Sequence, residues 1–350
     1  MKNQKLTLNQ IKRNDVLIKK CKTSKQIASL LNCSAKELTL HSFEPIYYHF
    51  KVPKKRKGAF RYIEAPSQEI KHLQRKLNYY LQSVYYLNQS KASYGYIIKA
   101  IGQKNTKNIY TNALQHLGST YMLNADFKDF FHQIALNDVV QIFKSKLFNF
   151  NKNTAYTLAK ICTYKGRLPM GAPTSPALSN LYSIALDHDL STWATLNKLI
   201  FTRFVDDLSF SSKNNLLNQT HFKQINNIAL KYHLNFNPNK TKYFSKTDKK
   251  IVTGLVLNNT VDIDKSYYNE LDKDINRLQK VIEVHHITGK TQGLAFLKEF
   301  KQQIMGKINF ISTIEGKNSK QYLTYLNSFH NALEVNNELV NRWTKFSNYI

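Results

Sequence analysis

Two adjacent carboxylates, Asp206 and Asp207, lie between two apolar runs that are rich in residues typical of strands. The stretch 201–210 therefore predicts a hairpin with both aspartates at its tip. Such a pair is weak support for a metal site by itself, because Asp is common in turns for local hydrogen-bonding reasons. A further carboxylate, Asp126, ends a predicted strand over 121–125. If this strand lies beside the hairpin in one sheet, three carboxylates supply oxygen donors for hard cations.

Nucleotidyl transfer is the chemistry that this set of donors favours. Two Mg²⁺ ions about 3.5–4 Å apart can activate an attacking 3′-hydroxyl and neutralise a leaving pyrophosphate. Mg²⁺ also suits carboxylates combined with substrate phosphates. We expect Asp126 and Asp206 to bridge two ions, with Asp207 in support. Asp129 is instead expected to be solvated or to begin a helix.

The elements that would position these residues follow from hydrophobic spacing. Residues 1–44 predict short helices, with Ser24 as one cap and with Ser34 and Glu37 forming a capping box. The stretch 48–63 predicts a β-hairpin with a basic tip. A helix with buried leucines should follow this hairpin.

The rest of the chain has two parts with different secondary-structure signals. Strand and helix signals alternate through the middle third, which predicts an α+β sheet domain. Beyond about residue 262 the strand signals fade, and Asp264 can cap the first of three predicted helices. The C-terminal end is therefore predicted to be a small helical bundle.

The charge balance predicts a polyanionic partner. The chain has 51 Lys and Arg against 23 Asp and Glu, a formal charge of +28 that would repel itself unless nucleic acid lies against it. A hydrophobic content of 42% excludes a disordered chain. No apolar run of about 18 residues and no signal peptide is present, so we expect a cytoplasmic protein without a membrane partner. Drift in an AT-rich genome remains an alternative source of part of the basicity.

The three cysteines, Cys21, Cys33 and Cys162, lack the paired spacing of zinc or redox sites. They are expected to be reduced and inert.

Three segments, in order, resemble the palm motifs of reverse transcriptases. The strand ending at Asp126 is similar to the first, and the hairpin is similar to the Tyr-x-Asp-Asp box, with Phe204 in place of Tyr. Between them, 168–176 resembles Leu-Pro-Gln-Gly-Ala-Pro-Thr-Ser-Pro, with Met170 in place of Gln. A loop rich in Gly and Pro is by default a rigid turn, but that reading leaves the order unexplained. Neither departure removes a metal ligand, so we expect an active enzyme rather than a dead relic.

This resemblance implies an α+β right-hand polymerase with fingers, a palm built on an RRM-like or ferredoxin-like antiparallel sheet, and a helical thumb. The expected domains are an N-terminal helical region over 1–44, the fingers and the start of the palm over 45–120, the catalytic palm over 121–260, and an RNA-binding thumb over 261–350.

The resemblance also implies a set of nucleotide contacts. Lys54 and Arg61 are expected to bind the triphosphate, with a solvated basic face as the alternative. Phe131 matches the steric gate that crowds a ribonucleotide 2′-hydroxyl, although a core Phe is the alternative. Lys240 is expected near the pyrophosphate, with Lys242 in reserve. The full set is Lys54, Arg61, Phe131, Met170, Gly171 and Lys240.

Two short signatures resemble those of retron enzymes among the reverse transcriptases. Asn112–His116 matches Asn-Ala-x-x-His, and Val252–Gly254 matches Val-Thr-Gly. A structural histidine and an ordinary strand end are the alternatives. The residues implied to bind RNA are Asn112, His116, Val252, Thr253 and Gly254.

A retron enzyme implies particular partners. These are a cognate structured noncoding RNA, its DNA product, dNTPs, a separate effector protein in antiphage defence, and a host RNase H, since no room is left for such a domain. Synthesis would start at a guanosine 2′-hydroxyl and leave branched, RNA-linked multicopy DNA. The rivals are an abortive-infection reverse transcriptase that makes DNA without a template and a non-catalytic RNA-binding scaffold.

Overall fold

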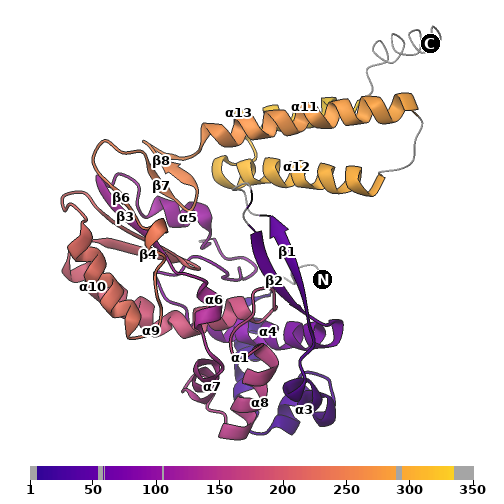
Figure 1. Ribbon diagram of the computed structural model, residues 1–350, viewed down its shortest axis with the longest axis vertical. Coiled ribbons are helices and arrows are strands. Elements are labelled where there is room, and N and C mark those ends of the chain that lie inside the picture. Colours follow the sequence, from indigo (N-terminus) through magenta and orange to yellow (C-terminus); the bar gives the residue numbers. More distant parts are fainter. Residues whose placement is uncertain (1–5, 54–57, 59, 105, 289–293, 335–350) are drawn as a thin grey trace. The chain divides into compact units, whose positions relative to one another are not determined.

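The computed structural model of the chain describes residues 6–53, 58, 60–104, 106–288 and 294–334. The chain divides into two compact units, Met1–Asp248 and Lys249–Ile350, and each is described by itself (Figure 1). Lys54, at the predicted hairpin tip, lies outside the described residues.

Three helices open the first unit, as predicted for its N-terminal residues. They are α1 (Leu8–Lys20), α2 (Ser24–Leu30) and α3 (Ala35–Phe43). The cap of α2 is Thr23, whose side chain accepts from the Gln26 N–H, so Ser24 is the first helical residue rather than the cap. Ser34 and Glu37 form the predicted capping box of α3.

The predicted hairpin and its following helix are both present. Strand β1 (Tyr47–Pro53) pairs antiparallel with β2 (Phe60–Pro66). Helix α4 (Gln68–Asn88) then buries Leu77 and Leu81 completely, because residues four apart share one helix face.

A four-stranded antiparallel sheet forms the centre of the first unit. Its strands are β3 (Tyr121–Asp126), β4 (Ile200–Phe204), β5 (Asp207–Ser212) and β6 (Lys242–Phe244), in the order β4-β5-β3-β6. The predicted strand and hairpin therefore do lie side by side (Figure 1).

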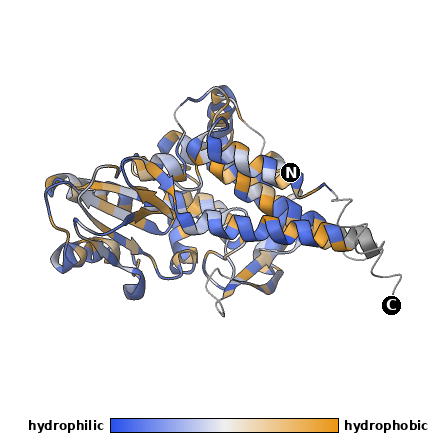
Figure 2. Cartoon of the chain, turned by 90° about the horizontal axis from the view of Figure 1, so that it is seen from above, coloured by the Kyte–Doolittle hydropathy of each residue, from blue (hydrophilic) through white to orange (hydrophobic). Residues whose placement is uncertain are grey.

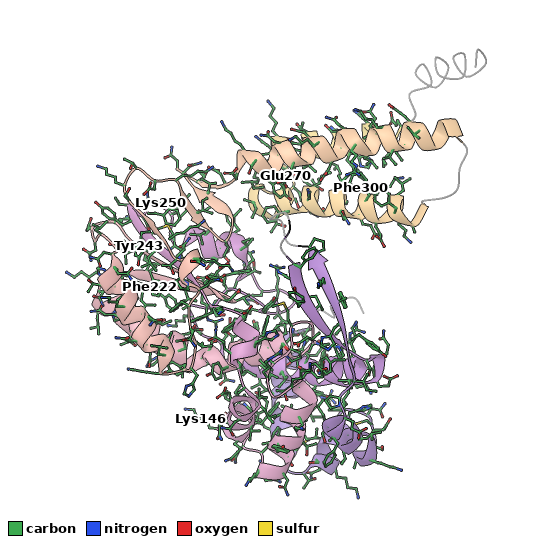
Figure 3. All side chains as sticks on the ribbon, viewed as in Figure 1. Lys146, Phe222, Tyr243, Lys250, Glu270 and Phe300 are labelled. Carbon is green, nitrogen blue, oxygen red and sulfur yellow. The ribbon has the colours of Figure 1, made fainter. Side chains whose placement is uncertain are left out.

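One face of this sheet is apolar and packs on α9 (Ser175–Leu196). Phe201 and Phe210 stack across strands with ring centroids 4.7 Å apart, and Trp193 of α9 meets Phe210 edge-on. Helix α10 (Gln219–Leu230) lies against α9 and is tied to β6 where the Tyr243 hydroxyl donates to Gln219, 2.6 Å away (Figure 3). Hydrophobic and hydrophilic residues are interspersed along the helices, as in helices with one buried face (Figure 2).

The other helices described in this unit are short. They are α5 (Ile109–Leu114), α6 (Phe130–Gln133), α7 (Leu136–Lys144), α8 (Lys152–Cys162) and the 3₁₀ turn η1 (Pro238–Lys240). Of these, α5 and η1 contact the sheet, α7 contacts α9, and α8 packs against α7 and α3.

The second unit combines a small sheet with three helices. The strands are β7 (Lys250–Val252), β8 (Leu255–Leu257) and β9 (Val261–Ile263), and the helices are α11 (Lys265–Thr288), α12 (Leu294–Glu315) and α13 (Lys320–Asn331). Asp264 caps α11 as predicted, since its carboxylate accepts from the Ser266 N–H at 2.8 Å. The small sheet groups with the helices, whereas the predicted end of the palm at residue 260 stays a prediction. Within the described residues, none of the helices has the length and apolarity to cross a membrane.

Candidate active site

The register of the central sheet brings the three predicted aspartates together. Asp126 ends β3 directly opposite Asp207, the first residue of β5. Asp206 occupies the turn between β4 and β5, and its carbonyl accepts from the Phe127 N–H at 3.1 Å. Residues paired across antiparallel strands share a face, so the Asp126 and Asp207 side chains stand on the face opposite to the Phe201–Phe210 stack.

The three carboxylates crowd each other electrostatically. Removal from water, followed by the charge of Asp126, raises the pKa of Asp206. Removal from water, a hydrogen bond with Asp126 and the neighbouring negative charges raise the pKa of Asp207. Positive charges on Lys240 and Arg61 act in the opposite direction at Asp206. Partial removal from water and the neighbouring carboxylates therefore both disfavour the charged forms, and a bound cation would offset this.

The donor set fits hard divalent ions, because it consists only of carboxylate oxygens. Within the described ranges no three His, Cys, Asp or Glu side chains are already arranged to hold a metal ion. One reason lies at Asp126, whose Oδ1 is 2.5 Å from Lys240 Nζ. Lys240 ends η1 and half of its side chain is exposed, whereas Lys242 begins β6 and points to solvent. The role of Lys240 at a pyrophosphate stays a prediction.

The predicted nucleotide loop packs against the hairpin. The Met170 carbonyl accepts from the Glu64 N–H at 2.8 Å. Gly171 has a φ of +133°, and a Cβ there would lie 2.8 Å from Ile63 Cγ2 and 2.9 Å from the Glu64 carbonyl. Only glycine fits so close to β2. The loop is thereby attached to the strand that carries Arg61.

Comparison with known proteins identifies the family. A family model described as reverse transcriptase (RNA-dependent DNA polymerase) matches residues 52–297. Retron Ec86 reverse transcriptase of Escherichia coli is 31% identical over 280 residues, which cover 79% of this chain and 78% of that protein. Retron Ec83 reverse transcriptase, also from Escherichia coli, is 27% identical over 225 residues, 61% of this chain and 69% of that protein. The chain belongs to the bacterial retron reverse transcriptases.

As a member of this family it is an RNA-directed DNA polymerase with an α+β polymerase fold. The family generally uses divalent metal ions. Among solved structures, telomerase from Candida albicans aligns with a TM-score of 0.43 at 14% identity, over 84% of this chain and 61% of that one.

The first retron signature lies inside the first unit. His116, which follows α5, is fully buried, and its ring nitrogens each lie 2.7 Å from a hydroxyl, Nδ1 from Ser211 and Nε2 from Thr202. Burial lowers the pKa of His116 to about 3, so the ring is neutral. Asn112 is 1% exposed. These side chains are not available for direct contact with RNA as the structure stands. Burial argues against direct RNA contact by either residue, and for His116 it favours the structural alternative.

The second retron signature forms a tight turn in the second unit. Thr253 and Gly254 join β7 to β8 with φ values of +48° and +86°. Positive φ at both central residues is typical of a type I′ hairpin turn. Val252 is buried, whereas Gly254 is exposed. RNA binding by this turn stays a prediction; Gly254 is exposed, whereas Thr253 is half-buried and its hydroxyl is covered.

The predicted gate residue fits both of its interpretations. Phe131 is half-buried in α6, and its ring centroid is 5.8 Å from that of the buried Phe130. Asp129 is exposed at the N-terminal boundary of α6, as predicted for a helix-start residue.

Two groups of paired charges with little exposure were not predicted from the sequence. Glu64 accepts two hydrogen bonds from Arg167, at 2.9 and 3.0 Å, and contacts His132 at 3.1 Å. Arg203 and Asp187 form a second pair with no exposed side-chain surface. Arg203 could have been suspected, because a charge inside an apolar strand requires a buried partner.

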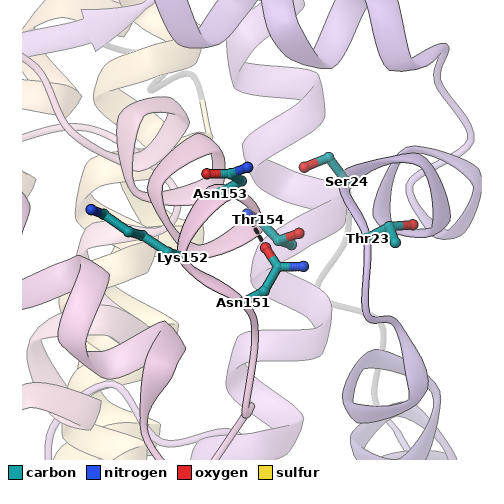
Figure 4. Close-up of a pocket in the computed structure, with 6 residues that line it drawn as sticks. All are labelled: Thr23, Ser24, Asn151, Lys152, Asn153 and Thr154. Atoms are coloured by element: carbon teal, nitrogen blue, oxygen red, sulfur yellow. Dashed lines mark hydrogen bonds between the residues drawn. The ribbon is translucent and has the colours of Figure 1, made fainter.

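A cavity of about 420 Å³ lies elsewhere in the first unit, at the start of α2 and α8 (Figure 4). It is lined by Thr23, Ser24, Asn151, Lys152, Asn153 and Thr154. The Asn151 side chain caps α8 by accepting from the Thr154 N–H at 2.9 Å. None of the three predicted metal ligands, Asp126, Asp206 and Asp207, lines this cavity, so it is separate from the candidate active site.

Proposed function

We propose that this enzyme copies its own structured noncoding RNA into branched, RNA-linked multicopy single-stranded DNA, and that it acts in antiphage defence beside a separate effector protein. Synthesis begins at a guanosine 2′-hydroxyl of that RNA, and a host RNase H trims the template. The observation that carries this proposal is the sequence match to retron reverse transcriptases over 79% of the chain.

We further propose that Asp126, Asp206 and Asp207 hold two Mg²⁺ ions. When bound, these ions would lower the charge barrier to attack on the dNTP. Asp126 and Asp206 would be the principal ligands, with Asp207 in support. The mutual repulsion of negative charge among the three aspartates, which a bound cation would relieve, supports this assignment. Lys240 neutralises part of that charge and stands ready to approach the pyrophosphate.

The hairpin is proposed to bind the triphosphate through Lys54 and Arg61. Arg61 is exposed and close enough to lower the pKa of Asp206 by its charge. An arginine offers a planar fork for phosphate oxygens. Phe131 selects deoxynucleotides, and the loop at Met170 and Gly171 borders the nucleotide.

The decisive experiment expresses the chain in a heterologous host together with the noncoding RNA gene, with inverted repeats, that we expect beside its reading frame. RNA-linked DNA should appear, and a debranching enzyme that cleaves 2′,5′ bonds should separate the DNA from the RNA. The Asp206→Asn variant is the matched negative control. If DNA is made equally well without the noncoding RNA, the enzyme is instead an untemplated polymerase. If no DNA is made although the protein still binds the RNA, the protein is a scaffold.

Nucleotide binding is tested separately from RNA binding. Arg61→Ala should raise the KM for dNTPs while the Kd for RNA changes little, because the +28 charge leaves many other phosphate contacts. Lys54→Ala is expected to act in the same direction. Equal losses in both quantities would refute the proposed division between hairpin and RNA-binding surfaces.

A further inference from the structure

The turn that carries Asp206 has an unfavourable backbone conformation. Val205 is the first central residue of the two-residue turn between β4 and β5, and its φ is +63°. A positive φ at this position alone is typical of a type II′ turn, in which glycine is the usual residue. A β-branched residue is strained there and persists only when its surroundings impose the conformation. The direction of Asp206 and Asp207 depends on this turn.

A fully buried arginine, Arg203, is hydrogen-bonded to this turn and paired with Asp187 of α9. Arg203 Nη1 donates to the Val205 carbonyl at 2.9 Å. Two other donors of the same guanidinium go to Asp187, with Nε–Oδ1 at 2.6 Å and Nη2–Oδ2 at 2.8 Å. Nη1 also lies 3.2 Å from Asn180 Oδ1. Because Arg presents a rigid planar fork, these partners determine where Nη1 meets the Val205 carbonyl.

The segment before α5 closes the other side of the turn. The Tyr94 N–H donates to the Arg203 carbonyl at 2.8 Å, and the Asn180 amide donates to the Gly95 carbonyl at 2.9 Å. A Cβ on Gly95 would lie 2.6 Å from Val205 Cγ2 and 2.8 Å from its nitrogen. Val205 is therefore enclosed between Gly95 and Arg203, and the Asn180 side chain is hydrogen-bonded to both of these residues.

Stability alone is a poor explanation for this buried ion pair. Removing two charges from water opposes folding, and a well-packed apolar pair of similar volume is often equally stable or more stable. An apolar pair, however, has no donor for the Val205 carbonyl. The contact that distinguishes the ion pair is therefore the one to the catalytic turn.

We propose that Arg203, oriented by Asp187 and Asn180, is a positioning residue that imposes the strained conformation of Val205 and so directs Asp206 and Asp207 toward their metal ions. The proposal rests on the metal-binding role assigned above to those aspartates. Arg203 acts through the backbone of the turn and touches neither substrate nor metal.

The test uses the full-length chain carrying the double substitution Arg203→Met with Asp187→Leu, which keeps the site apolar and filled. We expect a melting temperature close to the parent, a kcat on a generic RNA template and DNA primer lowered roughly 10²-fold, and an Mg²⁺ concentration for half-maximal activity raised about tenfold. Adding Val205→Gly should recover much of the loss, because glycine adopts the turn without support.

A second variant and a matched control keep the test decisive if the double variant folds poorly. Arg203→Lys keeps the buried charge but cannot reach Asp187 and the Val205 carbonyl as a fork does, so its Mg²⁺ requirement should also rise. Ser83→Ala removes a buried hydrogen bond of 3.2 Å to Asn14, far along the chain from the turn. It should lower the melting temperature without changing the Mg²⁺ requirement.

An unchanged Mg²⁺ requirement in the Arg203 variants, with activity falling only with the folded fraction, would overturn the proposal. Failure of the underlying assignment has a different signature: Asp206→Asn would then still polymerise, whatever the Arg203 variants do.

Discussion

Two hairpin turns in this chain place a β-branched residue at positive φ, yet they are supported in different ways. In the β4–β5 turn, Val205 is 8% exposed and its carbonyl is bound by the buried Arg203. In the β7–β8 turn, Thr253 is followed by the exposed Gly254, and the Thr253 hydroxyl has no hydrogen-bond partner among the described residues. The first turn is held by distant parts of the chain, the second mainly by its own two residues.

The difference separates two kinds of function. A turn enclosed by buried side chains is suited to keep carboxylates in one geometry, as metal binding requires. A turn with an exposed glycine backbone is suited to meet a partner there, whereas the Thr253 hydroxyl is buried in this structure. The comparison therefore supports catalysis at the first turn and recognition at the second, and the substitutions below test it.

The largest effect is expected at the first turn. Asp206→Asn keeps the size of the side chain but removes a charged metal ligand, so several kcal/mol of charge stabilisation and roughly 10³-fold in rate should be lost. RNA affinity, measured by filter binding at fixed salt, should remain that of the parent. Polymerisation at the parental rate would show that this turn is not the metal site.

A large loss of stability is expected at His116, which packs against strands β4 and β5. His116→Ala leaves the Ser211 and Thr202 hydroxyls unpaired and opens a cavity. We expect about 2–4 kcal/mol lower stability in chemical denaturation, with the rate per folded molecule retained on any template. A selective loss on the cognate RNA at unchanged stability would instead restore a recognition role to His116.

A smaller and selective effect is expected at the second turn. Thr253→Ala removes a buried hydroxyl without enlarging the residue. RNA recognition by this turn predicts that initiation on the cognate RNA then falls by about tenfold, equivalent to about 1.4 kcal/mol. Extension of a DNA primer on a generic RNA should not change. Thr253→Ser keeps the hydroxyl and serves as the matched control. Equal losses on both substrates would mean that the turn only maintains the fold.

The smallest effect concerns charge crowding at the first turn. The pKa of Asp207 is raised in the folded chain, so the folded state binds more protons and gains stability as the pH falls through that raised value. At pH values above neutral, Asp207→Asn should therefore cause a small rise in the melting temperature, measured with a chelator present. The difference from the parent should shrink toward pH 5. A variant less stable than the parent at every pH would contradict the crowding.

The sequence by itself determined the local elements and the order of the catalytic motifs. Hydrophobic spacing and capping residues predicted the N-terminal helices, the hairpin, the central strands and the C-terminal helices, because these signals act between residues close in the chain. Asp206 and Asp207 were recognisable for the same reason, since they are adjacent.

Only the tertiary structure decided which side chains are buried and what they hold. His116 was predicted to bind RNA, but the packing of its segment on the polar face of the sheet encloses it between Thr202 and Ser211. The contact of Arg203 with Asp187 depends on α9 lying under β4, and no spacing in the chain encodes that crossing. Burial and ion pairing depend on surfaces that meet only after folding, because water leaves a side chain only when another element covers it.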